Sequence, residues 1–187
     1  MPIEPRLIVT GHSHNGAAVF VEDRHPEPVN VQALPGADFY LLWGTPDGEA
    51  RVGEQDAKPV LRPYFPGLGG SRALFLRWAA HSSEPQPVPD PARVAEEVAE
   101  EVAEEVAEKL PGLTDPFEDN GDGMHTTDTV DYAICLEGEL CLELDDGAEV
   151  TLTPGTCVVQ LGTRHAWKNK ADQPALMCYV QIGAVRV

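Results

Sequence analysis

Residues 139–161 read ELCLELDDGAEVTLTPGTCVVQL, and this stretch decides the fold. Leucines alternate with mostly polar residues at its start (139–145), a period of two that is typical of a half-buried β-strand. Asp146-Gly147 supplies a turn, and the same alternation returns over residues 149–153. The apolar run at 175–182 predicts a final strand. Short antiparallel strands at even spacing indicate an all-β sandwich or barrel.

Polar residues that can carry chemistry flank this hairpin on both sides. His125, Thr127 and Asp131 lie an even number of residues apart, so on a strand their side chains share one face. His165 follows the later strand, three residues after Gly162. If the sheet curls closed, His165 faces the first group across the interior.

These residues resemble the two sequence motifs of the cupin superfamily over roughly residues 123–183. The positions that match the first motif are His125, Thr127, Asp131 and Gly138, and those that match the second are Gly162, His165 and Asn169. Gln160 stands where the family usually has proline. The resemblance implies an all-β, cupin-like double-stranded β-helix barrel (jelly roll), and it implies a homodimer.

The family's metal ligands fall on His125, Thr127, Asp131 and His165. Because a threonine hydroxyl is a poor ligand, the resemblance leaves a 2-His-1-carboxylate set of His125, Asp131 and His165, which suits Fe²⁺. Mn²⁺, Zn²⁺ and Ni²⁺ are also feasible. The alternative is a metal-free pocket in which the same three side chains exchange protons or bind by hydrogen bonds.

Further side chains are candidates for the wall of a substrate pocket. Tyr179 and Gln181 alternate on one face of the last strand, and that face either lines the pocket or is an ordinary sheet face. Trp167, two residues after His165, is either pocket wall or core. We expect the pocket to include Thr127, Gln160, Trp167, Tyr179 and Gln181. Gly138 and Gly162 are expected to adopt φ angles that oppose a side chain.

The chain divides into three parts by composition. Residues 1–83 predict β-strands that pack on the barrel, with a hairpin turning at Asn15-Gly16. The adjacent His12 and His14 have ligand-like spacing, but their place beside the turn favours a solvated hairpin tip. Residues 84–115 hold a Pro-rich linker and a Glu-rich helix, and residues 116–187 hold the barrel core.

The Glu-rich helix, over residues 92–110, repeats valine every fourth position, with Asp90 as a candidate cap and Pro91 in its first turn. Its narrow stripe of valine and alanine has little to bury, and its glutamates repel one another. We therefore expect a solvated helix that the barrel does not need. The alternative is an acidic helix that docks a partner.

Acidic residues outnumber basic ones 31 to 13, giving a net charge of -18, most of which lies in residues 84–131. This excess argues against a nucleic-acid partner. No apolar stretch is long enough for a membrane helix, and Met1–Arg6 lacks a secretory pattern, so a cytoplasmic location is expected. The four cysteines show no CxxC spacing and are expected to be free thiols.

The sequence therefore predicts a cupin-type enzyme acting on a small organic molecule inside the barrel. We expect a divalent metal to assist an oxygenase, decarboxylase, isomerase or lyase reaction. The alternative is a metal-free cupin module that binds a small molecule without catalysis. An interaction protein acting through the Glu-rich helix is a third class.

Overall fold

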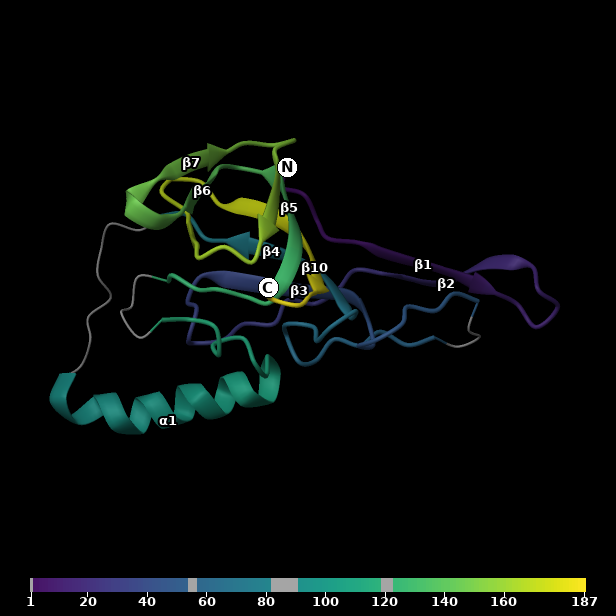
Figure 1. Ribbon diagram of the computed structural model, residues 1–187, viewed down its shortest axis with the longest axis horizontal. Helices are drawn as coiled ribbons and strands as arrows, with labels where there is room; N and C mark the ends of the chain where they lie inside the picture. The colour runs from purple at the N-terminus through teal and green to yellow at the C-terminus, as the bar shows by residue number, and fades with distance from the viewer. Residues whose placement is uncertain (1, 54–56, 82–90, 119–122) are drawn as a thin grey trace.

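A computed structural model describes residues 2–53, 57–81, 91–118 and 123–187, with side chains in the helix described from residue 100 onward. Two antiparallel sheets face each other and enclose the core, a β-ribbon extends to one side, and a helix lies below (Figure 1). Within these residues no helix is long and apolar enough to cross a membrane. All four cysteines are free thiols, as predicted.

The larger sheet joins strands from both ends of the chain. Its order is β3 (Ala37–Thr45), β4 (Ser71–Trp78), β10 (Ala175–Gly183), β5 (Thr129–Glu137) and β8 (Cys157–Leu161). The smaller sheet has the order β7 (Glu149–Leu152), β6 (Leu140–Glu143) and β9 (Ala166–Lys168), with a short 3₁₀ turn at Asp145–Gly147 between β6 and β7.

The path of the chain between the sheets has a regular alternation. After β5 the chain crosses to the smaller sheet for β6 and β7, returns for β8, crosses for β9 and returns for β10. Such repeated crossing between two facing sheets builds a jelly-roll barrel. The prediction of an all-β, cupin-like barrel with an inserted acidic helix is therefore confirmed. Strands β3 and β4 extend the larger sheet beside β10. Residues from all three expected segments (1–83, 84–115 and 116–187) therefore share one hydrophobic core.

Cross-strand pairing arranges the inner face of the larger sheet in rows of changing polarity. One row is apolar and consists of Phe39, Leu76, Met177 and Cys135. Two residues further along the strands, the row of Leu74, Tyr179 and Ala133 follows. The next row is polar and consists of Arg72, Gln181, Asp131 and Gln160, whose exposed fractions are 4–6%. The sheet thus carries a buried polar band at one end of an apolar core.

The N-terminal hairpin forms an arm of its own. Strands β1 (Leu7–His12) and β2 (Ala18–Arg24) pair only with each other and extend away from the barrel (Figure 1). Their connection spans residues 13–17, and Gly16 has a φ of 83°, whereas Asn15 is not in the left-handed region that a two-residue type I′ turn would require. The hairpin is therefore confirmed, but its turn is longer than predicted. His12 and His14 are exposed near the tip.

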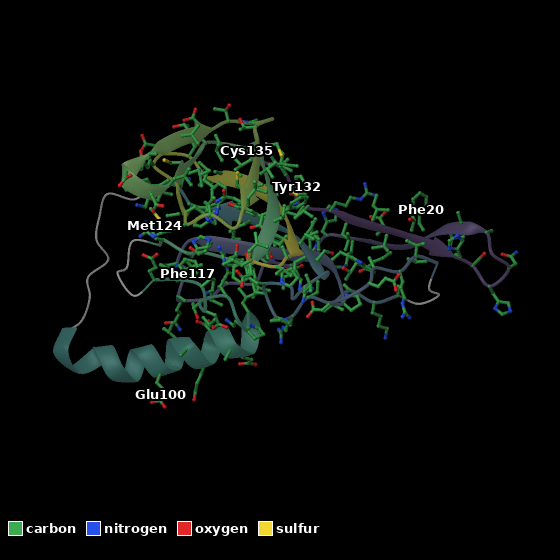
Figure 2. The ribbon with its side chains drawn as sticks, in the orientation of Figure 1. Phe20, Glu100, Phe117, Met124, Tyr132 and Cys135 are labelled. Atoms are coloured by element: carbon green, nitrogen blue, oxygen red, sulfur yellow. The ribbon has the colours of Figure 1, made fainter. Side chains whose placement is uncertain are left out.

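The C-terminal end of helix α1 (Pro91–Lys109) contacts the barrel, and Glu100 points away from it (Figure 2). There Val106 is 4% and Leu110 is 1% exposed, and both belong to the core. The Lys109 ammonium donates to the Asn30 carbonyl at 3.1 Å. The expectation that the barrel does not need this helix is wrong for its last turn. The predicted cap, Asp90, lies outside the described residues.

Gly138 and Gly162 have φ angles of 72° and 63°, as predicted. A Cβ atom on Gly138 would lie 2.2 Å from the Pro174 carbonyl oxygen, and one on Gly162 would lie 3.0 Å from the Thr127 carbonyl oxygen. Both positions therefore require glycine for the backbone conformation, and Gly138 requires it for space as well.

Candidate functional site

A cavity of about 50 Å³ lies between the two sheets, at the polar end of the core. The predicted site residues that line it are His125, Thr127, Asp131, His165, Trp167, Tyr179 and Gln181. Gln160 does not line the cavity but pairs with Asp131 across β8 and β5 and is 5% exposed. The residues chosen from sequence spacing thus gather in one place, and their individual roles stay predictions.

The two histidines are brought together by the backbone. The amide of His125 donates to the His165 carbonyl at 2.9 Å, and the reverse bond measures 3.0 Å. This reciprocal pair sets the imidazole ring centroids 4.2 Å apart. Phe117 stacks on the other side of His125, with centroids 4.5 Å apart, and Figure 2 shows Phe117 in the segment between the helix and the barrel.

Both imidazoles are held neutral with one nitrogen free. Their Nδ1 atoms lie 3.0 Å and 2.8 Å from the carbonyl oxygens of Gly123 and Thr163, so each Nδ1 carries the proton and donates. Burial lowers the pKa of His125. Burial and the neighbouring His125 lower the pKa of His165 to about 4. Each Nε2 is therefore left as a lone-pair acceptor at neutral pH.

Asp131 has a carboxyl oxygen without a partner. Its Oδ1 is buried and has no hydrogen bond within the described structure. Burial raises the pKa of Asp131 to about 6, and the Thr129 hydroxyl only partly opposes this. Gln181 Oε1 and the Tyr179 hydroxyl, which also line the cavity, are likewise buried and unpartnered there. The cavity is therefore bordered by polar atoms whose bonds the protein does not complete.

Thr127, at the position of a usual family ligand, is 5% exposed, and its hydroxyl accepts a hydrogen bond from Thr129 at 2.8 Å. Within residues 2–53, 57–81, 91–118 and 123–187, no group of three or more His, Cys, Asp or Glu side chains is arranged to hold a metal ion. The two free Nε2 atoms suit a metal, yet the third ligand is missing from this arrangement. The described residues thus do not fit the expected three-ligand centre.

A second, more open hollow of about 430 Å³ adjoins the cavity and shares Phe65 and Thr127 with it. Arg186 lies on its wall, bonded to the Asp128 carboxylate at 2.7 Å and to the Thr127 carbonyl at 2.8 Å. The hollow lies beside the cavity, and Phe65 and Thr127 line both.

Sequence reasoning missed most of the apolar wall. The additional aromatic side chains that line the cavity are Phe39, Tyr64, Phe65, Trp78 and Phe117. Phe39 and Trp78 lie on predicted strands, and strand alternation could have assigned them to the inner face. Tyr64, Phe65 and Phe117 lie in loops, where no periodicity indicates the direction of a side chain. The only sequence signal in these loops is the Pro-rich composition around Tyr64, which indicates a loop but no side-chain direction.

Comparisons with curated proteins give short matches to fungal biosynthesis proteins. Phomopsin biosynthesis cluster protein C' of Diaporthe leptostromiformis is 44% identical over 48 residues, which is 26% of this chain and 25% of that protein. Oryzines biosynthesis cluster protein J of Aspergillus oryzae is 39% identical over 61 residues, 32% of this chain and 34% of that protein. The matches thus span about a quarter to a third of those relatives. No protein-family model matches the chain.

Among solved structures, similar ones include the Cnp3 cupin domain of Schizosaccharomyces pombe, with 10% identity and a TM-score of 0.44 over 97% of this chain and 89% of that one. A Cupin_2 domain of a transcriptional regulator from Enterobacter cloacae has 17% identity and a TM-score of 0.34 over 60% and 80%. A structure described as a DMSP lyase has 10% identity and a TM-score of 0.40 over 79% and 48%. The neighbours thus include both enzymes and other proteins. The two facing sheets, the alternating strand path and the spacing of His125, Asp131, Gly138 and His165 together make this chain a cupin-like barrel.

Proposed function

We propose that the protein binds a small polar organic molecule in the cavity between the sheets and catalyses proton transfer on it. The observation that carries this proposal is the set of buried, unpartnered atoms Asp131 Oδ1, Gln181 Oε1 and Tyr179 OH around one cavity. Leaving such an atom unpaired costs about 1–3 kcal/mol. A bound molecule that completes these bonds recovers that free energy.

The chemistry follows from the protonation states of the three titratable groups. A carboxyl group with a pKa near 6 both accepts and releases a proton near neutral pH. The Nε2 atoms of His125 and His165 are unprotonated acceptors at the same pH. Asp131 and one imidazole can thus remove a proton from one atom of a substrate and return it to another. This capacity favours a lyase or isomerase reaction.

Native mass spectrometry of the purified protein tests this proposal directly. We expect a non-covalent adduct that denaturation releases and that the Asp131→Asn and Gln181→Leu variants lose. As a control, Asp172→Asn changes an exposed loop residue and should keep the adduct. Turnover of the identified molecule by wild type and not by Asp131→Asn separates an enzyme from the alternative, a binding module without catalysis. The same bare mass for wild type and variants would contradict the proposal.

A metal-assisted form of this function, implied by the resemblance, requires a third protein ligand beside the two imidazoles. A bound divalent metal would supply Lewis-acid chemistry, and the two free Nε2 atoms are the groups that would hold it. We expect wild type to retain Fe²⁺, Mn²⁺, Zn²⁺ or Ni²⁺ weakly, Thr127→His to bind more tightly, and His165→Ala not to bind. Tight, stoichiometric binding by wild type would show that Asp131 completes the set after all.

We also propose that the protein works as a homodimer, without a nucleic-acid partner, and in the cytoplasm. The dimer is supported by exposed apolar side chains on the outer face of the larger sheet. The most exposed are Leu161 at 70%, Val159 at 50%, Tyr132 at 42% and Ile182 at 37%. The net charge of -18 supports the expectation that nucleic acid is not bound.

A further inference from the structure

The walls of the cavity are formed largely by aromatic rings that meet edge to face. Phe39 and Tyr64 cross at 86° with centroids 5.7 Å apart, and Tyr64 and Phe65 cross at 87° with centroids 4.8 Å apart. Between the two sheets, Trp167 of β9 and Tyr179 of β10 cross at 76° with centroids 5.4 Å apart. All five of these side chains line the cavity. The face of an aromatic ring carries the negative end of its quadrupole.

The polar atoms that border the cavity are mainly acceptors, although the unpartnered Trp78 Nε1 is a donor among them. Asp131 is 6% exposed, and no lysine or arginine is among the described residues that line the cavity with it. Its Oδ1 and the Oε1 of Gln181 belong to cross-strand neighbours on β5 and β10, and both lack a donor. The Nε2 atoms of the two histidines add further acceptors. Among the described residues, the cavity thus presents a carboxylate, a carbonyl oxygen and aromatic rings, and no lysine or arginine side chain.

We propose that the natural ligand is a small organic cation, an amine or quaternary ammonium compound, whose charged group lies between the carboxylate of Asp131 and the aromatic walls. This inference rests on the proposed function and names the chemical class of its ligand. Aromatic faces attract organic cations most strongly when both are shielded from water. A cation also supplies the counter-charge that the buried carboxylate lacks.

Competing ligand classes fit less well. An anion would lie against Asp131, whose carboxylate repels negative charge. A neutral molecule could complete the hydrogen bonds but would leave the carboxylate charge unpaired. A metal ion finds no group of three or more side chains arranged to hold it among the described residues. The size of the cavity, about 50 Å³, favours a ligand, or a ligand head group, of a few heavy atoms.

The test compares three probes of similar size and different charge, which are propylammonium, n-propanol and propionate. Binding of each is measured at neutral pH by ligand-observed NMR, after removal of any co-purified ligand. We expect propylammonium to bind wild type and to bind Asp131→Asn roughly tenfold to hundredfold more weakly, because a charge-assisted hydrogen bond is lost. Asp172→Asn removes the same charge from an exposed loop and should bind like wild type.

Two results would overturn the inference. If n-propanol or propionate binds in the cavity as tightly as propylammonium, and Gln181→Leu weakens it, the cavity takes a small molecule of another class. The proposed function would then survive without a cationic ligand. If propylammonium binds Asp131→Asn and wild type equally, its binding does not involve the carboxylate and the inference fails. Native mass spectrometry of a co-purified adduct is independent of both results, since it assumes no charge on the ligand.

Discussion

At the scale of single residues, Asp131 and His165 respond to pH in opposite directions. The carboxyl of Asp131 has a pKa of about 6 in the fold against a usual 3.8, so between these values only the folded state holds the proton. The free energy of unfolding therefore falls as pH rises, by about 3 kcal/mol. His165 has a pKa of about 4 against 6.5, so there the unfolded state holds the proton and the free energy of unfolding rises by about 3 kcal/mol.

These two effects nearly cancel between pH 4 and pH 6 in the ligand-free wild type. Asp131→Asn removes the falling contribution. We expect its free energy of unfolding to increase with pH up to about 6.5 and to exceed that of wild type at neutral pH by up to about 3 kcal/mol. His125, whose pKa burial also lowers, adds to the rise. Urea unfolding at a series of pH values measures this, and parallel curves for the two proteins would contradict the burial of an unpaired carboxyl.

Gly138 and Gly147 form a matched pair for the cost of a left-handed backbone. Their φ angles are 72° and 70°, but a Cβ on Gly147 would meet nothing within 4 Å, whereas one on Gly138 would lie 2.2 Å from the Pro174 oxygen. Gly147→Ala should cost about 1 kcal/mol. Gly138→Ala should cost clearly more, because the β5–β6 turn and the start of β10 must separate. Equal changes in the midpoint of chemical unfolding for the two variants would show that the β5–β6 turn rearranges without additional cost.

At the scale of secondary-structure elements, the last turn of α1 belongs to the core. Leu110→Ala should lower the free energy of unfolding by about 2–5 kcal/mol, because its side chain is 1% exposed. Val106→Ala should cost more than Val102→Ala, since Val102 is only half-buried. Deleting residues 92–110 should abolish cooperative unfolding. A cooperative transition in that deletion variant, or equal costs for the two valines, would place the helix outside the core.

The helix also shows what spacing in a sequence can and cannot predict. A valine at every fourth position indicates a helix, but it does not reveal that the end of the helix joins one core cluster with Val31 and Tyr64, which are far away in sequence. In the site, a period of two correctly placed Thr127 and Asp131 on one face of the chain. The walls at Tyr64, Phe65 and Phe117 come from loops, whose side-chain directions depend on tertiary contacts. The strands of the barrel were therefore predictable, and the ring-lined cavity was not.

At the scale of the whole molecule, the outer face of the larger sheet is uncharged across three cross-strand rows. The rows are Tyr40, Phe75, Cys178, Ile134 and Cys157; Trp43, Ala73, Val180, Tyr132 and Val159; and Thr45, Ser71, Ile182, Val130 and Leu161. In a chain of net charge -18, this face is where two copies can meet without repulsion between their carboxylates.

Light scattering coupled to size-exclusion chromatography measures whether two copies associate. We expect the molar mass of a dimer for wild type and of a monomer for Leu161→Glu, because a charge would be buried in the contact. Val52→Glu is the control, since Val52 is 98% exposed and belongs to none of the strands of this face. A monomeric wild type, or a Leu161→Glu variant that stays dimeric, would contradict a contact through this face.

If the unpartnered polar atoms in the barrel face a bound molecule, electron density in the cavity will reveal that molecule. Crystals of wild-type protein purified without stripping should show density for an organic molecule between the two sheets. Its polar atoms should lie within about 3.2 Å of Asp131 Oδ1 and Gln181 Oε1. An empty cavity, or one in which these two oxygens are bonded to other groups of the protein, would contradict the account.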